Sequence, residues 1–120
     1  MRVIIAGSRG FTDYVLVSNI IDKTLKDNPE LKITEIISGG ARGIDTLAIR
    51  YAKEHNMPYK VYPAEWDAYG KSAGYRRNEV MSNNSDALIA IWNGISKGTR
   101  HMIDISNNKG LIVKVVVVKW

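Results

Sequence analysis

The strongest structural signal in the sequence is the stretch Ile37-Ser38-Gly39-Gly40-Ala41-Arg42-Gly43-Ile44-Asp45. Apolar residues 33–37 lead into it, and residues 47–52 lead out of it with the spacing of a helix. The stretch therefore predicts a strand that turns through paired glycines into a helix. At such a turn, backbone N–H groups and the positive end of the helix face one point, which suits an anion such as a phosphate. The alternative is that the glycines only make a tight turn.

Strands and helices alternate along the rest of the chain. Apolar runs predict strands over 2–6, 33–37, 59–62, 86–92 and 111–118, and helical patterns cover 14–27, 43–55, 73–83 and 99–107. Residues 63–74 have no clean period and predict a long loop. Continuous apolar strands that alternate with helices are typical of a parallel sheet covered on both faces. We therefore expect an α/β fold, a single three-layer Rossmann-like domain over residues 1–120 with a five-stranded, mostly parallel sheet.

The composition excludes several classes of protein. The 120 residues are 45% apolar and 24% charged, which is ordinary globular usage for one domain. Because the chain has no cysteine and two histidines, a disulfide framework is excluded and we expect no metal site and no cofactor. No apolar run is long enough to span a bilayer, and the amino end leads directly into a strand. We expect a soluble, cytoplasmic protein without a membrane partner.

The charge is distributed unevenly along the chain. The formal net charge is +5, which favours anionic partners in general. Seven of the 17 basic residues lie in or beside the glycine-bearing segments, namely Arg9, Arg42, Lys71, Arg76, Arg77, Lys97 and Arg100. Such clustering at loops favours a compact anionic ligand over a long nucleic-acid track, whereas a solvated basic surface without a partner is the alternative.

The polar, glycine-bearing segments all follow predicted strands. They cover 7–9, 38–45, 65–78 and 94–99. In a parallel sheet these positions meet at the carboxyl edge, where ligands bind near the point at which the strand order reverses. The chain has neither the Gly-x-Gly-x-x-Gly dinucleotide fingerprint nor the Walker loop. An ordinary dehydrogenase and a P-loop NTPase are therefore excluded.

Two groups of motifs resemble known families. The stretch from Ser38 to Asp45 resembles the glycine loop of the DNA-processing protein A family. Arg77-Asn78-x-x-Met81, Ser85-Asp86-Ala87 and Gly98-Thr99 resemble the lonely-guy phosphoribohydrolases of the same SLOG superfamily. Over nearly the whole chain, the pattern is most similar to the YspA-like branch of SLOG, on Ala6-Gly7-Ser8-Arg9, Phe11, Pro63-Ala64-Glu65-Trp66, Gly70-Lys71, Ala73-Gly74, Arg77-Asn78 and Gly94-x-Ser96-x-Gly98-Thr99. The resemblance implies a bacterial or phage protein that binds a nucleotide or nucleotide-derived ligand at these loops and pairs as a homo-oligomer.

The site residues follow from these segments. The candidate ligand-binding residues are Gly7, Ser8, Arg9, Ser38, Gly39, Gly40, Arg42, Gly43, Asp45, Trp66, Lys71, Arg77, Asn78, Gly94, Ser96, Gly98 and Thr99. The glycine loops and Thr99 are expected to hold the phosphate, and the arginines to neutralise it. Trp66 or Tyr69 is expected to cover the base. Arg77 and Asp45 are the candidate catalytic residues.

One departure from the family pattern bears on catalysis. The phosphoribohydrolases carry a glutamate three residues after the threonine of their glycine motif, and this chain has Met102 there. A thioether cannot transfer a proton or stabilise an oxocarbenium ion. The sequence therefore favours a nucleotide sensor or sequestering protein. A hydrolase that cleaves an N-glycosidic or phosphate bond is the first alternative, and a single-stranded DNA-binding module is the second.

Overall fold

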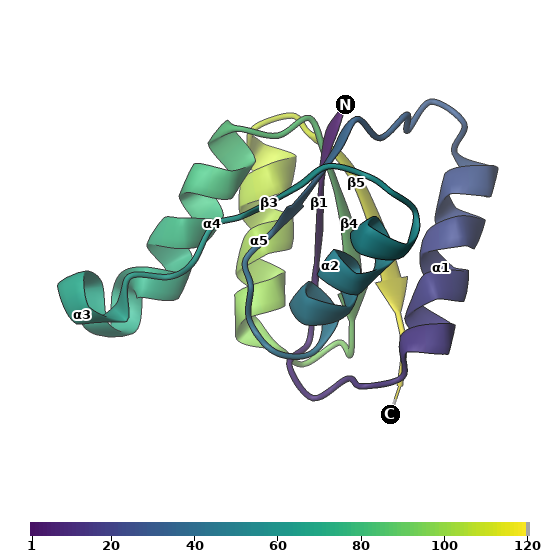
Figure 1. The fold of residues 1–120 in the computed structure, drawn as a ribbon. Helices are drawn as coiled ribbons and strands as arrows, with labels where there is room; N and C mark the ends of the chain where they lie inside the picture. The colour runs from purple at the N-terminus through teal and green to yellow at the C-terminus, as the bar shows by residue number, and fades with distance from the viewer. Residues whose placement is uncertain (120) are drawn as a thin grey trace.

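The computed structural model describes residues 1–119, which form a five-stranded sheet with helices on both sides (Figure 1). In chain order the elements are β1 (Arg2–Gly7), α1 (Tyr14–Asp27), β2 (Glu35–Ser38), α2 (Ile44–Glu54), β3 (Tyr59–Val61), α3 (Trp66–Tyr69), the 3-10 turn η1 (Gly70–Ser72), α4 (Ala73–Asn83), β4 (Ala87–Trp92), α5 (Lys97–Asn108) and β5 (Ile112–Val117). Residue 120, the end of the predicted domain, lies outside the described residues. No helix within 1–119 is long and apolar enough to cross a membrane.

The sheet confirms the predicted α/β fold. Its strand order is β3-β2-β1-β4-β5, and every adjacent pair is parallel. The chain builds outward from β1 to β3 and then returns to place β4 on the other side of β1. The strand order therefore reverses between β1 and β4, and the carboxyl ends of these two strands flank the switch point.

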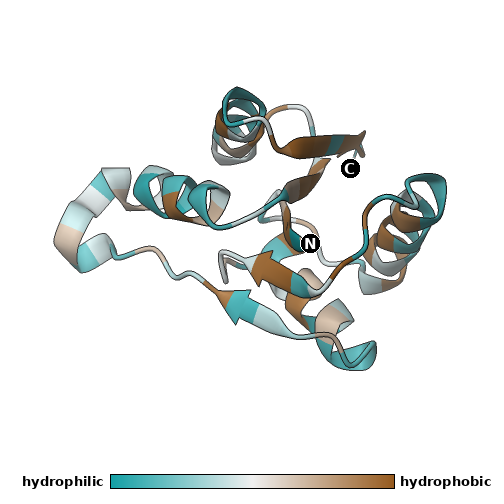
Figure 2. Ribbon diagram, turned by 90° about the horizontal axis from the view of Figure 1, so that it is seen from above, coloured by the Kyte–Doolittle hydropathy of each residue, from teal (hydrophilic) through white to brown (hydrophobic). Residues whose placement is uncertain are grey.

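The core lies in two layers, one on each face of the sheet. Val3 and Ile5 of β1 pack with residues of α1 and α2 on one face. Ile4, the residue between them, packs with Met81 of α4 and Met102 of α5 on the other face. The apolar strands lie between the helices in Figure 2, with the helices turning their apolar sides inward. Alternate residues of β1 are thus buried in opposite layers, which is why the strand is apolar throughout.

The predicted element boundaries hold with small shifts at their ends. The regular pairing of β2 begins at Glu35, which lies opposite Arg2 of β1, instead of at residue 33. Thr34, just before the strand, donates its N–H to the carbonyl of Met1. Helix α5 begins at Lys97, two residues before the predicted start, because Ser96 takes the N-cap position. All three residues of β3 are exposed, since it is an edge strand that has a neighbour on one side only.

The prediction of a loop over 63–74 is wrong in part. This segment contains α3 and η1, which continue directly into α4. Helix α3 is a single turn in which the N–H groups of Ala68 and Tyr69 bond to the carbonyl of Glu65. One turn is too short to show a helical period in the sequence. We call residues 65–72 the arm, because this segment projects away from the sheet in Figure 1 and all its residues are exposed.

Candidate functional site

A cleft of about 460 Å³ opens at the switch point between β1 and β4. Its wall contains these predicted residues: Gly7, Ser8, Arg9, Asp45, Trp66, Lys71, Arg77, Asn78, Ser96, Gly98 and Thr99. Three other predicted segments or residues lie behind or beside the wall, namely Ser38-Gly39-Gly40, Arg42-Gly43 and Gly94. The topology thus brings residues from four separate segments to one place, as the sequence predicted.

Ser8 joins the three segments that form the floor of the cleft. Its N–H donates to the carbonyl of Ile91 in β4, and its carbonyl accepts from the N–H of Ile44 at the start of α2, both at 3.3 Å. Its hydroxyl accepts from the N–H of Asn93 at 3.3 Å. Because Ser8 is only 3% exposed, these bonds are shielded from water. Ser8 therefore holds these three segments together, in addition to lining the cleft.

The amino end of α5 forms the second wall. Asn93 accepts from the N–H groups of Ile95 and Ser96 at 2.9 and 2.8 Å, which fixes the turn between β4 and the helix. The first-turn N–H groups of an α-helix have no carbonyl partner within the helix. Gly98 and Thr99 of this first turn line the cleft, and Gly98 has no heavy atom within 4 Å of where a Cβ would be. The partial positive charge of α5 is thus directed into the cleft.

The stretch 38–45 satisfies much of its own hydrogen bonding. The N–H of Gly40 donates to the hydroxyl of Ser38 at 3.1 Å, and the N–H of Ala41 donates to Asp45 Oδ2 at 3.3 Å. Ser38 is fully buried and also donates to the carbonyl of Asp45 at 3.0 Å. These contacts order the turn into α2 behind the wall of the cleft. Direct ligand contact by the residues behind the wall stays a prediction.

Arg77 reaches from α4 across the cleft to the glycine turn. Its Nη1 donates to the carbonyl of Gly39 at 2.6 Å, and its Nε donates to Oδ1 of Asn78 at 3.1 Å. A Cβ on Gly39 would lie 2.4 Å from Nη1 and 2.8 Å from Asp45 Oδ2, so a larger residue here would displace the ends of both side chains. Burial lowers the pKa of Arg77, and the carboxylate of Asp45 opposes that change. The neighbouring Arg76 instead stacks on Tyr69, 4.4 Å from the ring centroid.

Asp45 is the one carboxylate among the described residues that line the cleft. It is 6% exposed, and burial raises its pKa to about 6, although Arg77, Arg9 and the N–H groups of Ala41 and Gly7 act in the opposite direction. A carboxyl group that titrates near neutral pH is suited to proton transfer. No group of His, Cys, Asp and Glu in residues 1–119 is placed to hold a metal ion.

The raised pKa of Asp45 predicts how stability depends on pH. The folded protein retains this proton up to about pH 6, whereas the unfolded chain releases it near 3.8, so the free energy of unfolding decreases as the pH rises through this window. About two pKa units correspond to about 3 kcal/mol. Between pH 4 and pH 7, we expect the free energy of unfolding of Asp45→Asn to increase relative to that of the wild type by up to about 3 kcal/mol, measured by urea denaturation. A stability difference that stays constant with pH would contradict the assignment.

The arm brings an aromatic side chain to the mouth of the cleft. Trp66 is 50% exposed and lines the cleft, with the guanidinium of Arg9 6.0 Å from its ring centroid. Tyr69, the other residue predicted to cover a base, lines a separate hollow beside Val61 and Val80. The structure therefore favours Trp66 over Tyr69 as the aromatic residue of the site.

Sequence reasoning missed several residues of the wall. Tyr75 and Asn93 line the cleft and were not among the predicted site residues. Met102, which the sequence placed at the position of the phosphoribohydrolase glutamate, lies in the wall with 1% exposure. Asn93 could have been found, because an asparagine before a glycine at the end of a strand is a frequent turn former. Tyr75 carries no such signal, since the direction of its side chain depends on where the arm ends and α4 begins. His101, which was not among the predicted site residues, contacts Asn78 of the wall at 3.2 Å.

Known proteins are similar to this chain in sequence and in fold. The family model for the YspA, cpYpsA-related SLOG family matches residues 1–69. Gene 61 protein of Mycobacterium phage D29 is 33% identical in an alignment of length 118, and the match covers 93% of this chain and 93% of that protein. DNA processing protein A (DprA) from Streptococcus pneumoniae has the same fold, with a TM-score of 0.75 at 17% identity. The match covers 98% of this chain and 50% of the DprA chain, so this chain spans about half the length of that protein.

The family match covers β1 to α3 and thus includes the turn at Ser8, the stretch 38–45 and Trp66. The phage relative extends the similarity over nearly all of the remaining chain, including α4 and α5. Two independent comparisons therefore agree with the resemblance that the sequence motifs indicated. The chain belongs to the YspA, cpYpsA-related SLOG family.

Proposed function

We propose that the chain binds a nucleotide or nucleotide-derived ligand by its phosphate in the cleft between β1 and β4, as a sensor or sequestering protein. One observation carries the proposal. The cations Arg9, Lys71 and Arg77 converge with the first turn of α5 on one cleft, whose wall also contains the exposed ring of Trp66. Cations and free N–H groups suit a phosphate, and an aromatic face suits a base. A volume of about 460 Å³ lies in the range of about 300–1,000 Å³ typical of ligand pockets.

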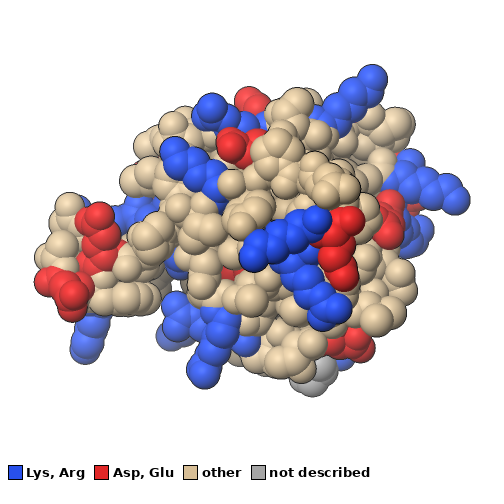
Figure 3. All heavy atoms as spheres, viewed as in Figure 1, with Lys and Arg blue, Asp and Glu red and all other residues tan. Residues whose placement is uncertain are grey.

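The charge pattern favours a compact ligand over a nucleic-acid track. On the face seen in Figure 3, blue and red side chains alternate over most of the surface, blue ones gather at the lower edge beside the arm, and the projecting arm carries both signs. A protein that follows a phosphate backbone needs a continuous basic stripe. The similarity to DprA supports a shared fold, and single-stranded DNA remains the ligand to test against.

A nucleotide hydrolase is the second candidate, and the raised pKa of Asp45 is the observation that favours it. Asp45 lies in the wall beside Arg77, where a general acid or base would be needed. Against this candidate, Met102 lies in the cleft wall at the position where the phosphoribohydrolases have a glutamate, and its thioether cannot transfer a proton.

Calorimetric titration with a panel of ligands tests the proposal. The panel holds nucleoside monophosphates and diphosphates, ADP-ribose, inorganic phosphate and oligo-deoxythymidines of increasing length. Saturable binding with an optimum at mononucleotide or dinucleotide size supports the proposal. Affinity that grows with oligonucleotide length and falls steeply with salt would instead identify a DNA-binding module. Released base or phosphate after incubation would identify the hydrolase. The proposal includes self-association, which sedimentation velocity measures directly.

Trp66 gives the proposal a residue-level test. We expect Trp66→Ala to weaken binding of the best nucleotide about tenfold, because stacking on a base contributes about 1–3 kcal/mol. Tyr69→Ala is the matched control, since Tyr69 is similarly exposed on the same short helix but lines the other hollow. Equal losses in the two variants would mean that Trp66 makes no contact with the base.

A further inference from the structure

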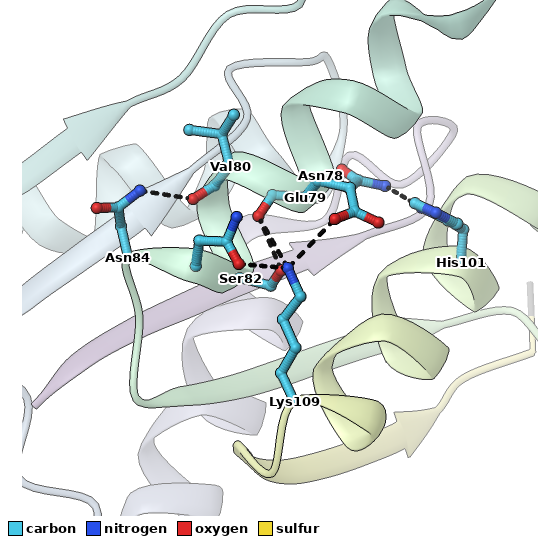
Figure 4. Close-up of polar contacts among 8 residues, drawn as sticks. Asn78, Glu79, Val80, Ser82, Asn84, His101 and Lys109 are labelled. Atoms are coloured by element: carbon cyan, nitrogen blue, oxygen red, sulfur yellow. Dashed lines mark hydrogen bonds and ion pairs between the residues drawn. The ribbon is translucent and has the colours of Figure 1, made fainter.

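A chain of hydrogen bonds connects the glycine turn to the middle of α5. Arg77 donates from Nη1 to the carbonyl of Gly39 at 2.6 Å and from Nε to Oδ1 of Asn78 at 3.1 Å. The amide nitrogen Nδ2 of Asn78 lies 3.2 Å from Nδ1 of His101 and 3.4 Å from the carbonyl of Gly98. Figure 4 shows the contact between Asn78 of α4 and His101 of α5.

The chemistry of arginine fixes the direction of this chain. A guanidinium has donors and no acceptor, so Asn78 must turn its oxygen toward Arg77. Its Nδ2, which can only donate, then faces His101. The ring nitrogen Nδ1 of His101 must therefore be the acceptor, which requires a neutral imidazole with its proton on Nε2. Because Asn78 is 7% exposed, water cannot readily replace a lost partner.

The surroundings of His101 favour the neutral ring. Burial lowers the pKa of His101, while the carboxylates of Glu79 and Asp104 act in the opposite direction. Both carboxylates have cations beside them. Lys109 bonds to Glu79 at 3.2 Å, as Figure 4 shows, and Arg100 lies 3.8 Å from Asp104. The ring of Tyr75 also lies against His101, in edge contact with its centroid 4.6 Å away.

We propose that His101 is a positioning residue, which holds Arg77 in its place in the cleft through Asn78 and releases it when the imidazole is protonated. His101 does not line the cleft, so it acts through Asn78 and not on the ligand. A proton on Nδ1 would set two donors against each other. Rotation of the Asn78 amide would relieve that contact but would turn Nδ2 toward Nε of Arg77, which is also a donor. A single proton on His101 therefore breaks either the Asn78–His101 bond or the Arg77–Asn78 bond. In the first case, Asn78 is held toward Arg77 only by its long bond to the carbonyl of Gly98.

The expected effect of His101 on ligand affinity rests on the proposed function. The direction in which the affinity changes with pH distinguishes this role from simple charge attraction. A protonated histidine near an anion site would by simple attraction increase the affinity as the pH falls. The hydrogen-bond chain predicts the opposite, because the guanidinium that contacts the phosphate loses its support. Asp45 also titrates in this range, so the effect of His101 must be taken as a difference between variants.

Two variants separate the acceptor from the ring. His101→Asn keeps an acceptor oxygen close to the position of Nδ1 and loses the ring, whereas His101→Phe keeps a ring against Tyr75 and loses the acceptor. With ADP-ribose as the probe, whose diphosphate charge is constant over the range of about pH 5–8 in which histidine titrates, we expect His101→Phe to bind about tenfold more weakly at pH 7.5. His101→Asn is expected to bind like the wild type there, and to exceed the wild type at pH 5.

The deciding measurement uses the ligand-free protein, so it holds even if ADP-ribose does not bind. Nitrogen-15 NMR of the wild type should show His101 protonated on Nε2 at pH 7.5. The Nε–H signal of Arg77 should shift on titration of His101 and in His101→Phe, but not in His101→Asn. A proton on Nδ1 at pH 7.5, or an Arg77 signal indifferent to His101, would overturn the proposal. Absence of binding to the whole ligand panel would overturn the proposed function alone.

Discussion

Replacing Arg77 with alanine is expected to weaken nucleotide binding at least about a hundredfold, the largest loss of any single change in the cleft. Arg77 is partly buried and already oriented by two bonds, to Gly39 and Asn78, so a phosphate meets a guanidinium that needs little reordering. Its removal also takes from Asp45 the cation that most opposes the rise of its pKa, in a cleft built for an anion. Calorimetric titration of the variant with the best ligand of the panel measures the loss.

Arg76→Ala is the matched control for this change. It removes the same charge one residue away, but its guanidinium stacks on Tyr69 and bonds to Ser72 outside the cleft. We expect the affinity of Arg76→Ala to stay within about twofold of the wild type, as for an exposed charge. Arg77→Lys should fall between, because an ammonium cannot bond to both Gly39 and Asn78 in the fork geometry of arginine. Equal losses for the two alanine variants would show that only the overall charge matters.

The fold could be predicted from the sequence because strands that are buried on both faces are continuous apolar runs. The runs Val3-Ile4-Ile5-Ala6 and Ala87-Leu88-Ile89-Ala90-Ile91 are buried on both faces, and strands of this kind occur in parallel sheets. The arm could not be predicted in the same way. A single helical turn with no buried residue shows no period, and its place is set by the start of α4.

The site could be predicted as a region but not residue by residue. Parallel topology requires that the segments after β1 and β4 meet, so Arg9 and Thr99 were expected at one edge. It does not say which side chains point inward. Arg42 follows the glycine turn as closely as any cation, yet it lies outside the wall, while Arg77 from the distant α4 fills the space in front of Gly39. His101 was passed over because its contact with Asn78 joins two helices whose packing the sequence does not display.

Replacing Gly43 with alanine is expected to lower the free energy of unfolding by about 4 kcal/mol or more, through strain and overpacking together. Gly43 has φ 81° and ψ −134°, a backbone conformation that side chains rarely adopt. An added Cβ would also lie 2.4 Å from the carbonyl oxygen of Arg9 and 2.5 Å from that of Ser8. Both are backbone atoms, so no rotamer change can relieve the contact. Urea denaturation followed by circular dichroism measures the loss.

Gly94→Ala separates the two causes. Gly94 has nearly the same φ, 83°, but no heavy atom lies within 4 Å of the Cβ position. It should therefore lose only the cost of the left-handed backbone, about 1–2 kcal/mol. The excess loss in Gly43→Ala then measures how closely the start of α2 packs on the turn after β1, together with any added backbone cost of the ψ of −134° at Gly43. Equal losses would mean that the turn after β1 can move away from the new Cβ without lowering the free energy of unfolding. A large excess would mean that the stretch 38–45 serves the site first by fixing Ser8 and Arg9, since the atoms that collide with the new Cβ belong to the residues that line the cleft.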